Sequence, residues 1–216
     1  MKKFALIFLS IVMVFSLAAC GTNSNKNNDA GKGNTTTTTA TPAEIEQKIA
    51  DAIGKDNYLC DIDIDKDYLQ NVYRLHLSKV ESYAAKQNSI ASVNPDTVIV
   101  LKTKDGYIAD AVKALNEGYA QIVDYIRQYP FGTAKVLNAR LYQSGDYVIY
   151  VIAGASYDGE DSEGENKLAV SEYAKIDEAI QSVLGTLPEN LAVVPEDDGG
   201  AGGLIVPEDD TPILGG

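Results

Sequence analysis

The sequence has one histidine (His76), no tryptophan and two cysteines among 216 residues. A single histidine cannot build a histidine-rich metal site, and a Ser-His-Asp or Cys-His arrangement would have to use His76. The chain also lacks a Gly-x-Ser-x-Gly elbow, a Gly-x-Gly-x-x-Gly fingerprint and a phosphate-binding loop. Without tryptophan it lacks the best stacking platform for sugars. We therefore expect no catalytic residue and no cofactor.

Positive charge is also scarce. Aspartate and glutamate number 31 against 18 lysines and arginines, which gives a formal net charge of −13. Such a chain is repelled by the phosphates of nucleic acids and by anionic lipid headgroups. We expect no nucleic-acid partner, and any membrane attachment must have another origin.

The first twenty residues have the layout of an export signal. Two lysines precede an apolar run, Phe4–Phe15, that is too short for a stable transmembrane helix. The run leads into Leu17–Cys20, which resembles the bacterial lipobox read by a lipoprotein signal peptidase. The resemblance implies lipidation of Cys20 and anchoring at the outer face of the cytoplasmic membrane. The alternative is a plain signal peptide with a coincidental cysteine.

The second cysteine, Cys60, has no partner for a disulfide if Cys20 is acylated. It lies between Tyr58-Leu59 and Ile62, a setting that favours a small buried apolar residue. A reactive thiol needs an electropositive setting, and the neighbouring Asp61 and Asp63 provide the opposite.

The chain divides into four parts by composition. Residues 1–19 are the predicted signal peptide, and their removal deletes two lysines and moves the formal charge from −13 to −15. Residues 20–41 are rich in Asn, Thr and Gly and should form a disordered tether. Residues 42–187 are the predicted folded domain. Residues 188–216 should be a disordered acidic tail, in which Val-Pro-Glu-Asp-Asp occurs twice, from Val194 and from Val206.

The predicted domain mixes helix and strand signals. Thr41, Pro42 and Glu44 form a capping box before a helix that Gly54 ends. The clearest helical periodicity runs over 107–129, and the most apolar segments are 97–101 and 147–153. The pattern predicts an α+β fold of two layers: a mostly antiparallel sheet of about four strands covered by the long helix, with flanking helices. The other expected elements are a mixed segment 55–80, an edge strand 80–85, a hairpin strand 136–142 turning at 144–146, an acidic loop 158–165 and a helix 171–184.

Calcium is the one metal ion that an exported acidic chain of this kind could still bind. The first alternative, a loop that starts at Asp61, has Lys66 where an EF-hand needs glycine and Val72 where it needs glutamate. A loop that starts at Asp161 has Asn166 at the glycine position, and its glutamates are too long for a tight loop. We therefore expect no metal site. The candidate ligands of this second loop are Asp161, Glu163, Glu165 and Glu172.

Several segments together resemble a known family. They are the lipobox, the strand Val98–Lys102, the helix end Gln128–Pro130, the segment Leu137–Ala139 and the hairpin reaching Gly145–Val148. This set resembles a family of Gram-positive lipoproteins classed as a domain of unknown function. The resemblance covers roughly 42–187 and implies a common fold and an envelope location; it carries no catalytic residue.

These observations favour a membrane-tethered binding or envelope-assembly module, attached through the lipid on Cys20 and open to a protein partner. Two alternatives stay open. One is a hydrolase of wall or peptide material that uses carboxylates of Asp61–Asp67 or Asp158–Glu165. The other is a small solute-binding lipoprotein, for which about 145 folded residues is short.

Overall fold

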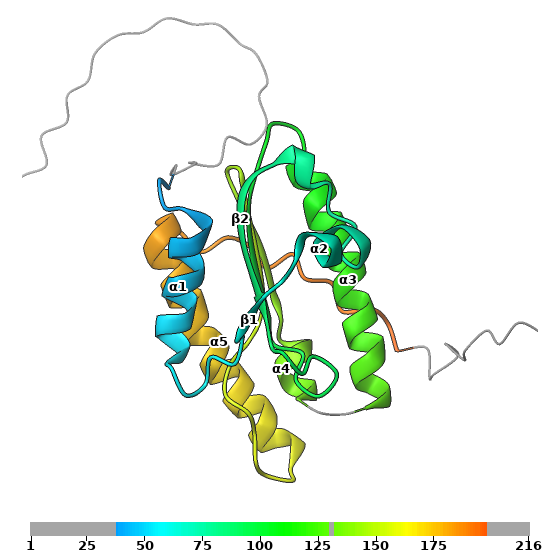
Figure 1. The fold of residues 1–216 in the computed structure, drawn as a ribbon. Helices are drawn as coiled ribbons and strands as arrows, with labels where there is room; N and C mark the ends of the chain where they lie inside the picture. Colours follow the sequence, from blue (N-terminus) through cyan, green and yellow to red (C-terminus); the bar gives the residue numbers. More distant parts are fainter. Residues whose placement is uncertain (1–37, 130–131, 198–216) are drawn as a thin grey trace, which may run out of the picture. The chain divides into compact units, whose positions relative to one another are not determined.

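The computed structural model describes residues 38–129 and 132–197 (Figure 1). Cys20, the predicted signal peptide, most of the tether and the second Val-Pro-Glu-Asp-Asp copy lie outside these residues. Within them, no helix is long and apolar enough to cross a bilayer. The elements in chain order are α1 (Pro42–Ile53), β1 (Ile62–Asp63), α2 (Lys66–Asn71), the 3-10 turn η1 (Leu77–Lys79), β2 (Val80–Gln87), β3 (Thr97–Thr103), α3 (Ile108–Gln128), α4 (Thr133–Leu137), β4 (Arg140–Ser144), β5 (Tyr147–Ile152) and α5 (Ser162–Leu184).

The strands form one sheet in the order β1-β2-β3-β5-β4, and every neighbouring pair is antiparallel. β3 and β5 lie side by side in the middle, with Thr97 opposite Ile152 at one end and Lys102 opposite Tyr147 at the other. The α+β class and the antiparallel sheet are confirmed. The sheet has five strands where about four were expected, because the two-residue β1 extends the β2 edge.

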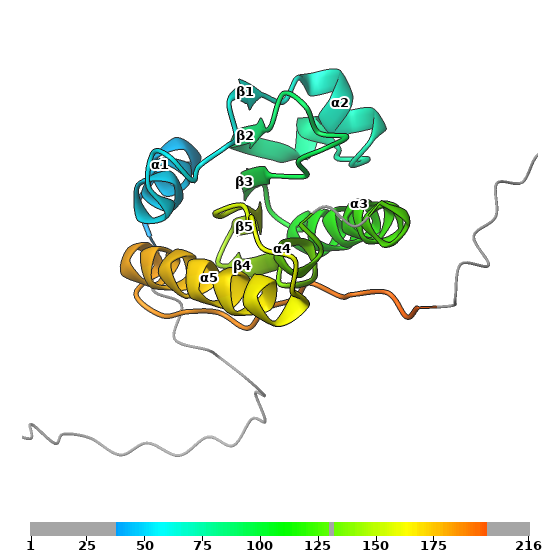
Figure 2. The ribbon, with the colours of Figure 1, turned by 90° about the horizontal axis from the view of Figure 1, so that it is seen from below.

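Helices cover both faces of the sheet. Figure 2 shows α1 and α5 on one side, with α2 and α3 on the other. Alternate side chains of β3 divide between two cores: Val98 and Val100 face α1 and α5, while Ile99 and Leu101 face α3. A strand that is apolar on both faces must be packed against other elements on both. The sheet therefore has helices on both faces, where the sequence predicted a helical layer on one.

Local signals place α1 as predicted. The Thr41 side chain accepts a hydrogen bond from the Glu44 amide at 3.3 Å, and the Glu44 carboxylate accepts from the Thr41 amide at 2.7 Å. Gly54 ends the helix with φ of +88°, a left-handed conformation that favours glycine. Along the helix, Ile45, Ile49 and Ile53 form one buried stripe that packs against the sheet.

Two elements differ from the sequence prediction. The segment from Val136 is not strand at first, because Gly132, with φ of +69°, precedes the short helix α4 and the strand begins at Arg140. The helix predicted from residue 171 begins at Ser162. Asp161 caps it by accepting from the Gly164 amide at 2.6 Å, so half of the expected acidic loop is helical.

Residues 188–197, expected to be part of a disordered tail, are extended and hydrogen-bonded to the domain. The Leu191 amide donates to the Leu141 carbonyl at 2.7 Å, and Arg127 donates to the Pro195 carbonyl at 2.7 Å. The segment therefore covers the outer edge of β4 and continues along α3 (Figures 1 and 2). Its composition alone did not indicate these partners.

Candidate ligand pocket at one end of the sheet

A pocket of about 790 Å³ lies among the described residues. It lies at the end of the sheet where Thr97 pairs with Ile152, between the chain that enters β3 and the chain that leaves β5. Helices α4 and α5 complete its wall. The lining combines apolar side chains with hydroxyl, amide and carboxylate groups, as ligand pockets commonly do. Its polar members are Asn94, Thr133, Lys135, Ser156, Tyr157, Glu160, Asp161, Ser162, Glu165 and Asn166.

A buried ion pair lies beside this pocket. The Lys135 ammonium pairs with the Asp96 carboxylate, and their side chains are only 8% and 0% exposed. Lys135 also donates to the Gly154 carbonyl at 3.2 Å. Burial raises the pKa of Asp96 to about 6, and the charge of Lys135 opposes that rise. Asp96, Lys135 and Gly154 come from three segments that meet only in the folded chain.

The loop between β5 and α5 forms one side of the pocket. Its Tyr157 hydroxyl donates to the Asp161 carboxylate and holds the pKa of that carboxyl low. A Cβ on Gly159 or Gly164 would lie 2.4 or 2.1 Å from Tyr157 side-chain atoms, so the ring lies against two positions that need glycine. The loop is thereby folded back on the first turn of α5.

The four candidate metal ligands do not converge. Asp161 caps α5, and Glu163 pairs with Lys167 at 2.6 Å on the exposed face of that helix. Glu165 accepts from the Ala134 amide at 3.2 Å. Glu172 is buried, pairs with Lys175 and accepts from the Ala155 amide. No group of three or more possible metal ligands occurs in the parts of the chain that the structure describes.

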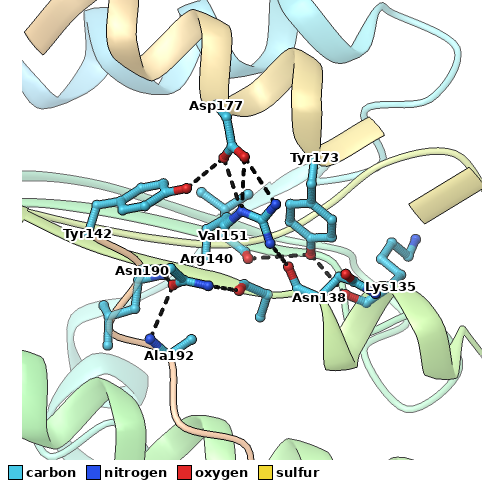
Figure 3. Close-up of polar contacts among 11 residues, drawn as sticks. Lys135, Asn138, Arg140, Tyr142, Val151, Tyr173, Asp177, Asn190 and Ala192 are labelled. Carbon is cyan, nitrogen blue, oxygen red and sulfur yellow. Dashed lines mark hydrogen bonds and ion pairs between the residues drawn. The ribbon is translucent and has the colours of Figure 1, made fainter. Parts of the chain in front are cut away.

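A polar network behind the pocket fixes α5 to the sheet (Figure 3). The Arg140 guanidinium donates to both carboxylate oxygens of Asp177, and the Tyr142 hydroxyl donates to the same carboxylate at 2.6 Å. Arg140 also lies over the Tyr173 ring, 4.6 Å from its centroid. The Tyr173 hydroxyl in turn donates to the Lys135 carbonyl at 2.9 Å, which connects this network to the backbone of α4.

One comparison with known protein families matches the part of the chain that contains all five strands. Residues 56–153 match the family model of a domain of unknown function (DUF4358). The match runs from before β1 to the end of β5, so it includes Asp96 and Lys135 but neither α1 nor α5. Neither the search of curated proteins nor that of solved structures finds a match. The expected resemblance to a family without an assigned function is thus met over 56–153, while its lipoprotein and Gram-positive character stays a prediction.

The alternating carboxylates near Asp61 also do not form a site. Asp61 accepts from the Ser89 amide and hydroxyl, Asp63 pairs with Lys86 at 3.0 Å, and Asp65 caps α2. Each of these three carboxylates therefore has its own structural partner.

Two other residues singled out in the sequence lie apart from the pocket lining. His76 is exposed next to η1, and the unpaired Cys60 is buried as expected. Burial raises the pKa of the Cys60 thiol, which keeps it protonated and unreactive at neutral pH.

Sequence reasoning missed Asp96 and Lys135. Asp96 follows Pro95 just before β3, and Lys135 immediately precedes the segment 136–142 that the sequence predicts as a strand. A lysine between the apolar residues Ala134 and Val136, just after a glycine turn, is the one local signal that could have drawn attention to it.

Proposed function

We propose that this protein is a lipid-anchored extracytoplasmic module that binds a small polar ligand, neutral or cationic, in the pocket between β3, β5, α4 and α5. The observation that carries the proposal is the pocket itself, about 790 Å³ with polar and apolar walls. The lipobox at Leu17–Cys20 supports the anchor and hence the location. The same domain could serve envelope assembly if the ligand is part of a larger partner.

A diacylglyceryl group on Cys20 would bind the membrane strongly enough to hold the protein there. Each buried methylene contributes about 0.8 kcal/mol, and two acyl chains hold a protein on a membrane where one does not. We expect the chain made in its host to incorporate labelled palmitate and to sediment with membranes. A Cys20→Ser variant should lose both properties, whereas Cys60→Ser should retain them. A native chain that begins at Met1, or a free Cys20 thiol, would contradict the anchor.

The position of the pocket suits a tethered receptor. The Tyr147 hydroxyl donates to the Ala40 carbonyl at 2.7 Å, so the domain meets its predicted tether at the Lys102–Tyr147 end of the sheet. The pocket lies at the other end, roughly 20 Å away along β3. Figure 1 shows these two ends as the start of α1 and the region of α4. A ligand would then enter at the end opposite the tether.

The charge of the pocket selects the ligand class. Glu160, Asp161 and Glu165 contribute carboxylates to its lining, and its one cation, Lys135, already pairs with Asp96. The chain as a whole is also acidic. An anion would be repelled, whereas an amine or a neutral polar group would not.

The proposal is tested by NMR titration of the domain with the peptides Lys-Lys, Ser-Ser and Glu-Glu. We expect the amide signals of 155–169 to shift with Lys-Lys or Ser-Ser and not with Glu-Glu. Glu160→Gln/Glu165→Gln should weaken Lys-Lys binding several-fold, because two carboxylates of the lining lose their charge. The local structure should persist, since an amide oxygen at residue 165 can still accept from the Ala134 amide. Glu178→Gln, on an exposed part of α5, is the matched control. Shifts with Glu-Glu alone, or none with any peptide, would refute the ligand class.

A carboxylate-dependent hydrolase is the second candidate, and the raised pKa of Asp96 is the observation in its favour. A general acid must reach the scissile group within hydrogen-bond distance. Asp96 is fully buried and paired with Lys135, so it serves the fold rather than a substrate. Binding therefore remains the better-supported function.

A further inference from the structure

A second, smaller hollow lies on the other side of the sheet from α5. It has a volume of about 190 Å³ and is lined by residues of α2, α3 and the turn that joins β2 to β3. None of the lining residues carries a charge. They are Tyr68, Val72, Tyr73, Gln87, Ala91, Pro95, Thr97, Gly118, Gln121, Ile122 and Tyr125. We call this hollow the tyrosine groove.

Exposed apolar side chains surround the tyrosine groove. Val72 and Tyr125 line it and are exposed, and Tyr129 packs on Tyr125 with ring centroids 5.0 Å apart. Ile90 projects from the turn that supplies one wall and is 61% exposed, while Val93 of the same turn, 59% exposed, lines the larger pocket. The Tyr125 hydroxyl fixes this turn by donating to the Ser92 carbonyl at 3.0 Å. Clustered exposed apolar groups of this kind mark contact surfaces.

The chain leaves the described structure next to this surface. Arg127 donates to the Pro195 and Glu196 carbonyls, and Asp197 is the last described residue. Arg127 lies in the last turn of α3, between Tyr125 and the C-cap residue Tyr129, so the exit and the groove share one end of one helix. Figure 2 shows segment 188–197 and α2 on opposite sides of α3, which places the exit and the groove on different sides of the same helix.

The sequence that follows has an apolar run at a suitable distance. Asp198–Gly203 contains four glycines and no large side chain, and Leu204–Pro207 (sequence LIVP) follows it. Six residues span at most roughly 20 Å. A helix with side chains is about 10–12 Å across, so half of its circumference is roughly 17 Å. The linker is therefore long enough to bring Leu204 around α3.

We propose that Leu204–Pro207 of the same chain docks in the tyrosine groove and covers the exposed apolar surface around it. The contact is tethered, so it does not need high intrinsic affinity. A short flexible linker gives an effective concentration in the millimolar range, and a segment with a dissociation constant of about 1 mM would then fill the groove about half of the time. The groove suits this occupant because neither carries a charge, and most of the groove lining is apolar or aromatic.

Cysteine cross-linking tests the proposal in residues 20–216 with Cys20→Ser, which retain the domain and the whole tail. Ala91→Cys in the groove is combined with Val206→Cys in the tail, and mild oxidation is followed by gel electrophoresis. Cys60 is buried and does not interfere. We expect an intramolecular cross-link of monomer mass. The control, Ser171→Cys on the exposed face of α5 with the same tail cysteine, should give at least tenfold less.

A second comparison separates docking from chance encounter. Leu204→Asp/Ile205→Asp in the Ala91→Cys/Val206→Cys chain should lower the yield about tenfold, whereas Glu208→Gln/Asp209→Asn should not. Equal yields at Ala91→Cys and Ser171→Cys, or yields unaffected by the aspartates, would overturn the proposal. A cross-link found only at twice the monomer mass would also overturn it, because the occupant would be the tail of a second copy. These outcomes are independent of ligand binding in the larger pocket.

Discussion

Lys135 and Asp96 form an ion pair that is almost completely buried, although they lie in different segments, one in α4 and one just before β3. Removing one member of such a pair leaves an uncompensated charge in the protein interior. We expect Lys135→Met to lower the free energy of unfolding by about 3–5 kcal/mol, measured by urea denaturation at pH 7. The double variant Lys135→Met/Asp96→Asn should recover part of that loss. A Lys135→Met chain as stable as the unaltered one would show that the pair does not stabilise the fold.

The same carboxyl should make stability depend on pH. The pKa of Asp96 rises from its ordinary 3.8 to about 6 in the folded chain, so the folded state binds more protons between these values. Its contribution is complete below about pH 4 and is lost as the pH rises through about 6. The change should reach at most about 3 kcal/mol. The measurement is the free energy of unfolding as a function of pH for the unaltered chain and for Asp96→Asn. The difference between the two curves isolates the contribution of Asp96, because acids with lowered pKa such as Glu44 and Asp61 act in both chains. A difference that grows with rising pH would contradict the assignment.

The Arg140–Asp177 pair should stabilise the attachment of α5 to β4. Both side chains are about four-fifths buried, at 18% and 19% exposure, and the pair is bidentate. A double-mutant cycle of Arg140→Met and Asp177→Asn should give a coupling free energy of about 1–3 kcal/mol. The exposed pair Glu163–Lys167 is the matched control and should give well under 1 kcal/mol. Equal coupling in the two cycles would show that burial does not matter here.

Asn190 should hold segment 188–197 against the edge of β4. Its side-chain oxygen accepts from the Leu141 amide at 2.8 Å, and its amide group donates to the Ala139 carbonyl at 3.0 Å (Figure 3). Asn190→Ala should destabilise the domain by about 1–3 kcal/mol, because these backbone groups lose their partners. Hydrogen exchange at the Leu141 amide should accelerate. Asn190→Asp, which retains the acceptor but not the donor, should protect that amide better than Asn190→Ala; the reverse order would count against this role.

The Cys60 thiol should be unreactive until the domain unfolds. It is buried and its pKa is raised by that burial, so little thiolate forms at pH 8. We expect a thiol reagent such as DTNB to label it slowly in the native chain with Cys20→Ser and at once in urea. An Ala91→Cys thiol in the exposed turn gives the reference rate. Fast native labelling of Cys60 would contradict its burial.

Some elements followed from the sequence because their signals are local. The capping box at Thr41 and the glycine at 54 define α1 within a single turn at each end. The apolar repeat of α3 and the continuous apolar run of β5 report burial directly, since each residue of such a run must face a core. The α+β class follows from these elements. Cys20 and its lipobox are likewise a feature of sequence alone, and the lipid there stays a prediction.

Tertiary structure decided the rest, because the interactions concerned join residues far apart in the chain. Asp96 and Lys135 have no common sequence pattern, and only the meeting of three segments makes them partners. Residues 188–197 have the composition of a free tail, yet the edge of β4 and the side chains of α3 supply hydrogen bonds that composition cannot reveal. The pocket has the same origin, since a cavity is the space left between packed elements and no single segment encodes it.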